Sequence, residues 1–585
     1  MTLWIAQNFV PLMFLGLLVL LLSGIPVAFG LAATGLLFGW IGMSLSGLHP
    51  EVLSIGANLF QALPLRVFGI MQNDTLLAIP FFTLMGIILE RSGMAEDLLE
   101  TVGQVFGPVR GGLAIAVVLV GALLAATTGV VAAAVISMGL ISLPIMLRYG
   151  YNRTIATGTI TASGTLAQAI PPSLVLIVLA DQLGRSVGDM YAGALVPGLL
   201  LVGMYLLFII AIAIVKPAWV PALPPEARIY KEPNGSAGYP SLLALLLVCA
   251  AAGWVWHGQH ESLINPLLDR QLPAPEDERL ILSMTVGALL AWGLALANKF
   301  LRLGLLSRLA QQVTFVLIPP LVLIFLVLGT IFLGVATPTE GGAMGAVGAL
   351  AMALAKRRLS LSLLNQALDN TLRLSCFVLF ILIGSTVFSF TFNAADGHVW
   401  VEHLFDSMPG GALGFLIVVN ILIFVLGMFI DFFEIAFIVV PILAPVAEKL
   451  LPALVPGMPP DMVMIWFGVI IAMNLQTSFL TPPFGFALFY LRSVAPGKDY
   501  KDRVTGATIP AVTTAQIYKG SIAFIALQLV MVAAVIAFPQ LVAGNIAVTE
   551  KVDADAAMEQ MAPKDDMFDM VPVEPVDGAG SAPQP

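Results

Sequence analysis

The sequence predicts an all-α polytopic membrane protein, with about twelve transmembrane helices and two re-entrant hairpins arranged as an inverted repeat. Three observations lead to this fold class: the composition, the lengths of the apolar runs, and a pattern repeated around two double prolines. Of the 585 residues, 59% are hydrophobic and only 10% are charged, and the mean hydropathy is +0.98. Because a water-exposed surface needs more charge, this composition excludes soluble, disordered and nucleic-acid-binding proteins.

The apolar runs are long enough to cross a bilayer repeatedly, since a spanning helix needs about 20 residues. We expect transmembrane helices near residues 3–22, 26–43, 75–90, 154–181, 189–215, 240–256, 279–297, 308–333, 338–356, 371–392, 461–492 and 519–540.

Two further apolar runs, 112–147 and 413–450, do not fit single crossings. Each run is broken in its middle, and at about 1.5 Å per residue each half reaches only part of the way through the membrane. Irregular backbone at this depth is tolerated only where protein buries it. We therefore interpret both runs as re-entrant hairpins.

With both runs as hairpins, most of the 26 lysines and arginines fall on one side of the membrane. The positive-inside rule makes that side cytoplasmic and places both termini outside. We divide the chain into a first repeat with the first hairpin, a polar linker with an extra helix pair, a second repeat with the second hairpin, and an acidic tail, at 1–215, 216–307, 308–540 and 541–585. The tail is rich in Pro, Ala and carboxylates, so we expect it to be disordered.

The two halves of the chain are most similar in sequence directly after each hairpin. Thr161–Pro172 aligns with Ala472–Pro483, and both segments end in a double proline. In the predicted topology the paired hairpins enter from opposite sides and the paired helices run in opposite directions. This arrangement is typical of inverted repeats, which bind their substrate near the membrane midplane between discontinuous helices.

The double prolines indicate where binding chemistry is expected. Proline cannot donate a backbone hydrogen bond, so each helix must unwind there. Freed carbonyls with nearby hydroxyls and amides suit a small cation, and exposed N–H groups at helix starts suit a carboxylate. The polar candidates are Thr127, Thr128 and Gly129 in the first hairpin, Ser163, Thr165 and Gln168 before the first break, Asp431 in the second hairpin, and Asn474, Gln476, Thr477, Ser478 and Thr481 before the second break.

Simpler interpretations remain for each candidate. A serine or threonine in a membrane helix commonly donates a hydrogen bond back to its own helix. The second hairpin could be shallow, in which case Asp431 is simply hydrated, and Glu340 is expected to cap its helix. No nucleotide-binding loop and no GxSxG motif occurs, so we expect neither an enzyme nor a cofactor. A membrane-embedded hydrolase that uses Asp431 and Glu434 stays a minor alternative.

Several motifs resemble one known family. They are Gly24–Phe29, Leu77–Phe82, Arg110–Ala114, Ala162–Thr165, Ile170–Ser173, Thr337–Glu340, Leu426–Asp431 and Leu480–Gly485. With these motifs the chain resembles the large membrane subunit (DctM-like, M subunit) of tripartite ATP-independent periplasmic (TRAP) transporters, in its longer variety. The resemblance implies a bacterial inner-membrane protein with periplasmic termini, whose transport core moves against a scaffold in an elevator mechanism.

The resemblance also implies a function and partners. It implies sodium-coupled uptake of an organic acid, usually a carboxylate, which a periplasmic solute-binding protein delivers, and a small membrane subunit that completes the complex. We hypothesise that the extra helix pair replaces or docks this small subunit. A stand-alone sodium/anion symporter or exchanger of similar inverted-repeat fold is the alternative function.

The resemblance assigns roles to individual residues. It implies one sodium site at Thr127, Thr128, Gly129, Ser163, Gly164 and Thr165, and a second at Asp431, Asn474, Gln476, Thr477 and Thr481. The substrate is expected between them, at Gln168, Pro171, Pro172, Ser173, Pro482 and Pro483.

Overall fold

The structure is a computed structural model that describes residues 1–546 except 57, 231, 233–236, 268–272, 303, 407–408, 503 and 545. Within helices, the side chains of Leu22, Thr128, Asp277 and Asp406 are also outside the description. Almost all of the predicted acidic tail, residues 547–585, lies outside the described residues.

The first 215 residues form eleven α-helices and three 3-10 turns. The helices are α1 (Thr2–Gln7), α2 (Phe9–Leu22), α3 (Val27–Ser46), α4 (Leu63–Met71), α5 (Ala78–Arg91), α6 (Met94–Phe106), α7 (Gly112–Thr128), α8 (Val131–Arg148), α9 (Arg153–Thr165), α10 (Leu174–Gln182) and α11 (Val187–Val215), and the turns are η1 (Leu59–Ala62), η2 (Asp74–Leu77) and η3 (Leu166–Gln168). The predicted first span is divided at Asn8, and the predicted span 154–181 is divided at the double proline.

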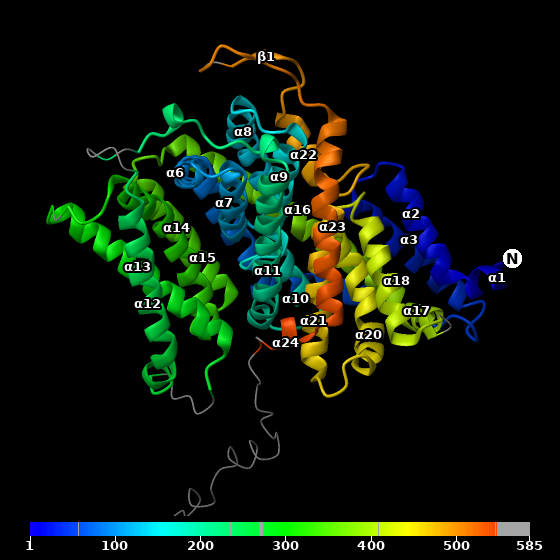
Figure 1. Cartoon of the computed structure of the whole chain (residues 1–585). Helices are drawn as coiled ribbons and strands as arrows, with labels where there is room; N and C mark the ends of the chain where they lie inside the picture. Colours follow the sequence, from blue (N-terminus) through cyan, green and yellow to red (C-terminus); the bar gives the residue numbers. More distant parts are fainter. Residues whose placement is uncertain are drawn as a thin grey trace, which may run out of the picture. The chain divides into compact units, whose positions relative to one another are not determined.

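The middle of the chain contains η4 (Pro217–Trp219), η5 (Pro225–Ala227), α12 (Tyr239–Ile264) and α13 (Glu276–Phe300). Helices α12 and α13 are the expected extra pair and lie beside α14 (Arg308–Phe332) at one flank of the molecule (Figure 1). They approach closely because small residues meet. A Cβ on Gly253 would lie 2.9 Å from the Ser283 carbonyl oxygen, and one on Gly287 would lie 3.1 Å from that of Cys249.

The second half repeats the hairpin and broken-helix pattern. Its elements are α15 (Pro338–Ala355), α16 (Leu361–Ala394), α17 (Gly397–Asp406), α18 (Gly411–Leu426), α19 (Phe432–Glu434), the π-helix η6 (Ile435–Val439), α20 (Val440–Leu450), η7 (Leu451–Ala453), α21 (Pro460–Ser478), α22 (Phe486–Val494), β1 (Tyr500–Lys501), β2 (Thr508–Ile509), α23 (Thr514–Ala537) and α24 (Gln540–Ala543). The two strands pair antiparallel, with Tyr500 opposite Ile509. Helix α24, with Val542 buried, extends the ordered chain a few residues past the predicted start of the tail.

The all-α polytopic membrane fold is confirmed. By length and composition, ten helices of the described chain can cross a membrane, or up to eleven if the bent pair Leu59–Met71 and Asp74–Arg91 counts as one span. Eight of the ten coincide with expected spans, and the other two, Val131–Arg148 and Phe432–Ala453, lie in the runs interpreted as hairpins and are each long enough to cross. The sequence analysis missed α4, α6 and α17, which are short, and α6 is amphipathic, with a buried face and with Glu96 and Asp97 in its first turn.

Hydrogen bonds and ion pairs join the segments at one end of the helices. Arg148 of α8 binds Asp502 beside the β1–β2 turn at 2.9 Å, and Arg358 binds Asp97 at 2.9 Å. The Arg148 guanidinium holds the pKa of the Asp502 carboxyl well below its usual range. At this end Figure 1 shows the strand β1 above α8 and α22.

A second set of contacts joins the opposite end. Arg185, after α10, binds Glu448 at 2.7 Å and also contacts Asp461, while Asn73 donates to Asp181 at 2.7 Å. The helix α15 begins at this end with the capping box that the sequence predicts, because Glu340 accepts from the Thr337 backbone at 2.8 Å. The hairpin α7–α8 therefore starts and ends at the first end, and the hairpin α18–α20 at the second.

Candidate functional site

The tip of the first hairpin is a left-handed turn. Helix α7 ends at Thr128, Gly129 has φ +59°, and α8 begins at Val131. A Cβ on Gly129 would lie 3.1 Å from Cγ of Leu174, the first residue of α10. Thr127 is buried and its hydroxyl donates to the Leu124 carbonyl at 2.9 Å. The tip is thus packed against the segment that follows the first double proline.

The two helices of the first hairpin, α7 and α8, pack against α9 at the predicted ligands Ser163 and Gly164. A Cβ on Gly121 of α7 would lie 2.5 Å from the Ser163 Cβ, and one on Gly164 would lie 2.3 Å from the Val135 side chain of α8. Gly164 is therefore required for close packing. The Ser163 hydroxyl donates to the Thr159 carbonyl at 2.6 Å, and Ser163 is fully buried.

The first break contains a buried amide without a partner. Helix α9 ends at Thr165, and α10 begins only after Pro171 and Pro172. Both amide atoms of Gln168 are buried, and neither makes a hydrogen bond within the described protein. A buried polar group left unpaired costs about 1–3 kcal/mol, so this amide is the strongest local sign of a binding position. Ser173 donates to the Gln168 carbonyl at 2.9 Å, which folds the break back on itself.

The tip of the second hairpin begins a helix. Asp431 follows α18 and caps α19, because its carboxylate accepts the Phe432 N–H at 2.8 Å while Glu434 accepts the Asp431 N–H at 3.1 Å. This capping box repeats the chemistry of Thr337 and Glu340. Asp431 therefore has a local structural role that the sequence analysis did not consider.

The second break lies after α21. Thr477, Ser478 and Thr481 donate to carbonyls three or four residues earlier, at 2.8–3.0 Å. The expected back-bonding is thus present, but a hydroxyl that donates its proton still offers oxygen lone pairs to a cation. Beyond Pro482, the carbonyl of Pro483 accepts from the Tyr518 hydroxyl of α23 at 2.7 Å.

The two breaks meet through a buried polar cluster. Gln476 of α21 donates to the Thr165 hydroxyl of α9 at 3.5 Å. Gln528 of α23 donates to the same hydroxyl at 3.4 Å and to the Tyr205 hydroxyl of α11 at 2.7 Å. The amide oxygens of Gln476 and Gln528 are buried without a partner within the described protein. Thr165 and Gln476, assigned by resemblance to different sodium sites, are therefore direct neighbours.

Some predicted ligands are not brought into contact. Within the described chain Asp431 makes no hydrogen bond with Asn474, Gln476, Thr477 or Thr481. Asn474 instead donates to the backbone carbonyl of Asn420 at 2.7 Å and to its side chain at 3.0 Å. The sequence analysis missed Asn420, Gln528 and Tyr205, although Asn420 and Gln528 are isolated amides in apolar helices, which is a recognisable signal.

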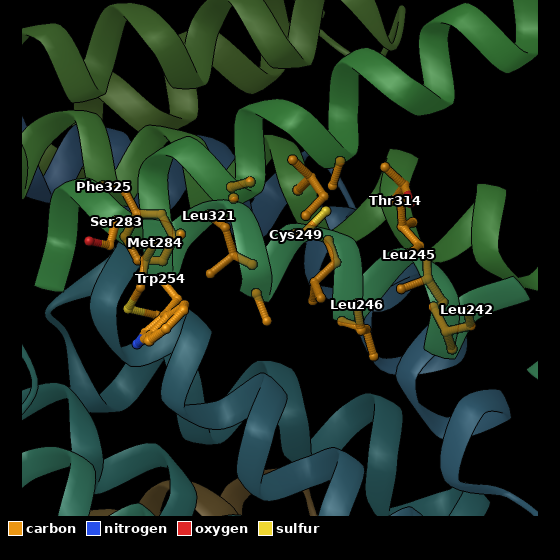
Figure 2. Close-up of a pocket in the computed structure, with 18 of the residues that line it drawn as sticks. Leu242, Leu245, Leu246, Cys249, Trp254, Ser283, Met284, Thr314, Leu321 and Phe325 are labelled. Atoms are coloured by element: carbon orange, nitrogen blue, oxygen red, sulfur yellow. The ribbon is translucent and has the colours of Figure 1, made fainter. Parts of the chain in front are cut away.

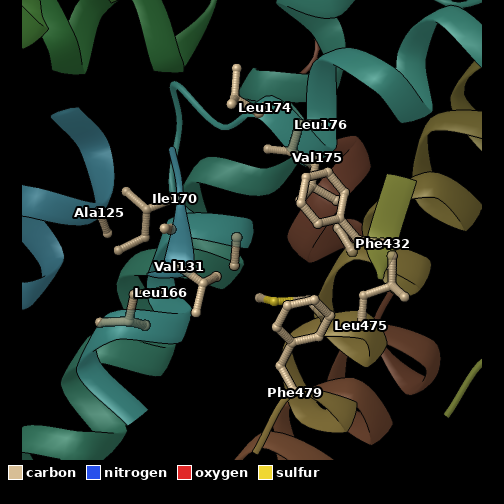
Figure 3. Close-up of a cluster of buried hydrophobic side chains, with 14 of the residues drawn as sticks. Ala125, Val131, Leu166, Ile170, Leu174, Val175, Leu176, Phe432, Leu475 and Phe479 are labelled. Atoms are coloured by element: carbon tan, nitrogen blue, oxygen red, sulfur yellow. The ribbon is translucent and has the colours of Figure 1, made fainter. Parts of the chain in front are cut away.

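An apolar cluster includes Leu166 and Leu475, the chain neighbours of Thr165 and Gln476 (Figure 3). Val131 from the first hairpin, Leu166 and Leu174 from the first break, and Phe432 and Phe479 from the second half lie together in this view. The ring centroids of Phe432 and Phe479 are 6.4 Å apart. The apolar surroundings strengthen electrostatic interactions with the few polar groups that they enclose.

Another cavity lies away from the breaks, between α12, α13 and α14 (Figure 2). It has a volume of about 630 Å³ and is lined mainly by apolar side chains such as Leu246, Trp254, Met284 and Phe325. This lining offers little that would hold an organic acid.

Comparisons with known proteins show which family the chain resembles. The family model described as tripartite ATP-independent periplasmic transporter, DctM component, matches residues 14–541. The C4-dicarboxylate TRAP transporter large permease protein DctM of Pseudomonas aeruginosa is 28% identical over 444 residues, which are 76% of this chain and 83% of that protein. The sialic acid TRAP transporter large permease protein SiaM of Vibrio cholerae is 24% identical over 475 residues, 79% of this chain and 89% of that protein.

Two further likenesses are more distant. The isethionate TRAP transporter permease protein DctMQ of Oleidesulfovibrio alaskensis is 22% identical over 478 residues, 81% of this chain and 61% of that protein. The crystal structure of the YdaH transporter of Alcanivorax borkumensis covers 87% of this chain with 12% identity and a TM-score of 0.49, below the level usually taken to mean a shared fold. The family match extends over most of the chain, and on that ground the protein belongs to the DctM family of TRAP transporter large permeases, which are membrane transport proteins and not enzymes.

Proposed function

We propose that this permease couples sodium entry to the uptake of an organic acid, a carboxylate, which a periplasmic solute-binding protein delivers. The observation that carries the proposal is the junction of two broken membrane helices at Thr165 and Gln476, 3.5 Å apart, in an apolar surrounding. Broken helices at this depth typically bind ions through freed carbonyls and acids through exposed N–H groups. The names of the relatives, which specify C4-dicarboxylate, sialic acid and isethionate, support an organic anion as cargo.

Each sodium ion would be bound by one hairpin tip and one break. The first set is Thr127, Thr128, Gly129, Ser163, Gly164 and Thr165, and the second is Asp431, Asn474, Gln476, Thr477 and Thr481. Neutral oxygens dominate both sets, and hard oxygen ligands suit a small cation. The unpaired amide oxygen of Gln476 supports the second set.

The organic acid would lie between the two sets, at Gln168, Pro171, Pro172, Ser173, Pro482 and Pro483. The unpaired amide of Gln168 supports this position, because its NH₂ group can donate to a carboxylate. The N–H groups at the start of α10, just after the first break, offer further donors.

The membrane arrangement and partners form part of the same proposal. Both termini would be periplasmic, and the end that carries Arg148 and the β1–β2 turn would be cytoplasmic. The repeats 1–215 and 308–540 would supply the core and scaffold of an elevator. A small membrane subunit would complete the complex, and the extra pair α12–α13 would dock or replace it beside the apolar cavity of Figure 2.

Reconstitution tests the proposal. The permease, its small subunit where the operon encodes one, and the cognate binding protein are placed in liposomes, and uptake of the acid retained by that binding protein is measured. We expect uptake that requires an inward sodium gradient and the binding protein. Uptake that persists when potassium replaces sodium on both sides would reject sodium coupling, and equal uptake without the binding protein would favour a stand-alone symporter.

A further inference from the structure

A second cavity, with both polar and apolar side chains in its lining, lies between α4, α10, α16, η6 and α20. It has a volume of about 430 Å³, and its polar lining comprises Arg66, Gln182, Ser385, Thr386, Ser389 and Asn393. Phe437 of η6 and Pro441 of α20 close it on the side of the second hairpin. Gln182, which lines the cavity, donates to the Asp181 carboxylate at 2.8 Å, and Asn73 donates to the same carboxylate. The cavity therefore lies at the end of the molecule where these three residues meet.

The polar lining of α16 forms a stripe on one face of a long membrane helix. Ser385, Ser389 and Asn393 recur at four-residue spacing, with Thr386 beside them. Ser385 donates to the Phe437 carbonyl. Among the described residues the side chains of Thr386, Ser389 and Asn393 have no hydrogen-bond partner, and all three are partly or fully exposed. Polar side chains in a spanning helix normally face protein or a water-filled cavity, so this stripe indicates a wet passage.

Arg66 supplies the positive charge of the cavity. It lies on α4, and its guanidinium carbon is 5.9 Å from the centroid of the Phe390 ring on α16. No carboxylate of the described chain forms an ion pair with Arg66, whereas Arg185 and Lys449 at the same end are paired. The guanidinium therefore remains available to a carboxylate, which it can bind through two parallel hydrogen bonds.

Two elements that line the cavity also carry residues of the candidate site. Phe437, which lines the cavity, follows the tip residue Asp431 by six residues in the same continuous helical segment. Gln182 ends α10, which begins at the first break. The elements that carry the candidate site at one end therefore line this cavity at their other end.

We infer that this cavity is an outer vestibule for the organic anion, in which Arg66 attracts the carboxylate and the stripe of α16 replaces its hydration on the way to the breaks. The inference rests on the proposed function and adds a residue-level route to it. A phosphate of a lipid headgroup has similar chemistry, so the experiment must separate a substrate carboxylate from a lipid.

The test is a charge series at Arg66 in the complete reconstituted transporter, with vesicles of phosphatidylcholine alone and of phosphatidylcholine with phosphatidylglycerol. KM for the loaded binding protein, kcat, the sodium half-saturation and the affinity of the binding protein for the vesicles are measured. We expect R66Q to raise KM about three- to tenfold, R66E to raise it further, and R66K to stay within about twofold of the wild type, in both lipids. The effect should shrink at high ionic strength, because salt screens the attraction.

Lys449→Gln is the matched control, since it removes a cation at the same end that is paired with Glu402. We expect its KM to equal that of the wild type. The double variant Ser389→Ala/Asn393→Leu removes the stripe without a change in charge and should raise KM with kcat lowered by less than twofold.

Three results would overturn the inference while wild-type uptake stays sodium-dependent. These are an R66E variant with unchanged KM, an effect confined to vesicles with phosphatidylglycerol, which would assign Arg66 to lipid, and a loss of binding-protein affinity that accounts for the whole change in KM. Failure of the wild type to transport with sodium would instead reject the proposed function itself.

Discussion

The two hairpin tips and their breaks are built alike but are covered differently. In the first half, Gln168 and Ser173 are fully buried and Thr127 is 2% exposed. In the second half, Phe429 before the tip is 53% exposed and Phe484 after the break is 60% exposed. The first break is therefore closed throughout, whereas the second is buried as far as Phe479 and open only at Pro483 and Phe484.

The exposed residues after the second break face the end of the molecule that carries the β1–β2 turn. Tyr518, near the start of α23 and soon after β2, donates to the carbonyl of Pro483 in the second break. In this structure the protein leaves the end of the second break uncovered, whereas the first break is covered by its hairpin.

Cysteine labelling tests the difference in cover directly. In a background without Cys249 and Cys376, Phe484→Cys should react with a membrane-impermeant maleimide at least tenfold faster than Thr127→Cys, because only the former side chain is exposed. The measurement is the labelling rate in oriented vesicles, with and without sodium. Equal rates at the two positions would contradict the comparison.

The charge of Asp431 can be separated from its capping role. Asparagine caps helices about as well as aspartate, so Asp431→Asn should preserve stability while Asp431→Ala costs about 1 kcal/mol. If the carboxylate also assists sodium binding, Asp431→Asn should raise the sodium half-saturation concentration about tenfold. Sodium-dependent uptake and thermal unfolding are measured on both variants. An unchanged sodium dependence in the asparagine variant would leave Asp431 with the capping role alone.

The turn at Gly129 should be sensitive to a side chain. Gly129→Ala adds strain of about 1–2 kcal/mol at positive φ, together with a close contact to Leu174. Gly411→Ala is the matched control, because Gly411 has φ +55° but no atom within 4 Å of its added Cβ. We expect a larger drop in Tm for Gly129→Ala than for Gly411→Ala. The same drop in both would show that packing of the first tip contributes little.

The ion pair of Arg148 and Asp502 should give the smallest effect, on stability alone. Because the pKa of Asp502 is lower in the folded state, its carboxylate stabilises the fold above the unfolded pKa of about 3.9, and this contribution is lost as the pH falls below that value. Asp502→Asn should therefore lower Tm at pH 7, and the difference from the wild type should diminish below about pH 4. A difference that is constant over this range would exclude the ion pair as its cause.

Much of the fold could be predicted from residue types alone. Long apolar runs require helices in a bilayer, the double prolines require breaks, and Thr337 with Glu340 predicts a helix start that the structure confirms. The left-handed turn at Gly129 follows from a glycine between two apolar helices. The cap formed by Asp431 and Glu434 has the same spacing, but the cost of a carboxylate in a membrane drew attention to ligand binding instead.

The contacts of the site could not be predicted in the same way. Thr165 and Gln476 are 311 residues apart, and Gln528 and Tyr205 belong to helices that the repeat pattern did not mark. Asn474 binds Asn420, and no local pattern distinguishes this partner from Asp431. Nothing in the sequence pattern distinguishes Arg66 from the other basic residues.

The sequence by itself determined that the helices lie in a lipid bilayer, where they break, and which types of side chain stand at the breaks. These features depend on local composition and backbone geometry. Only the tertiary structure decided which side chains meet, which break is covered and whether a basic side chain such as Arg66 finds an acidic partner. Those outcomes depend on packing between helices that are distant in sequence, and in a membrane protein nearly every helix is apolar enough to pack in several ways.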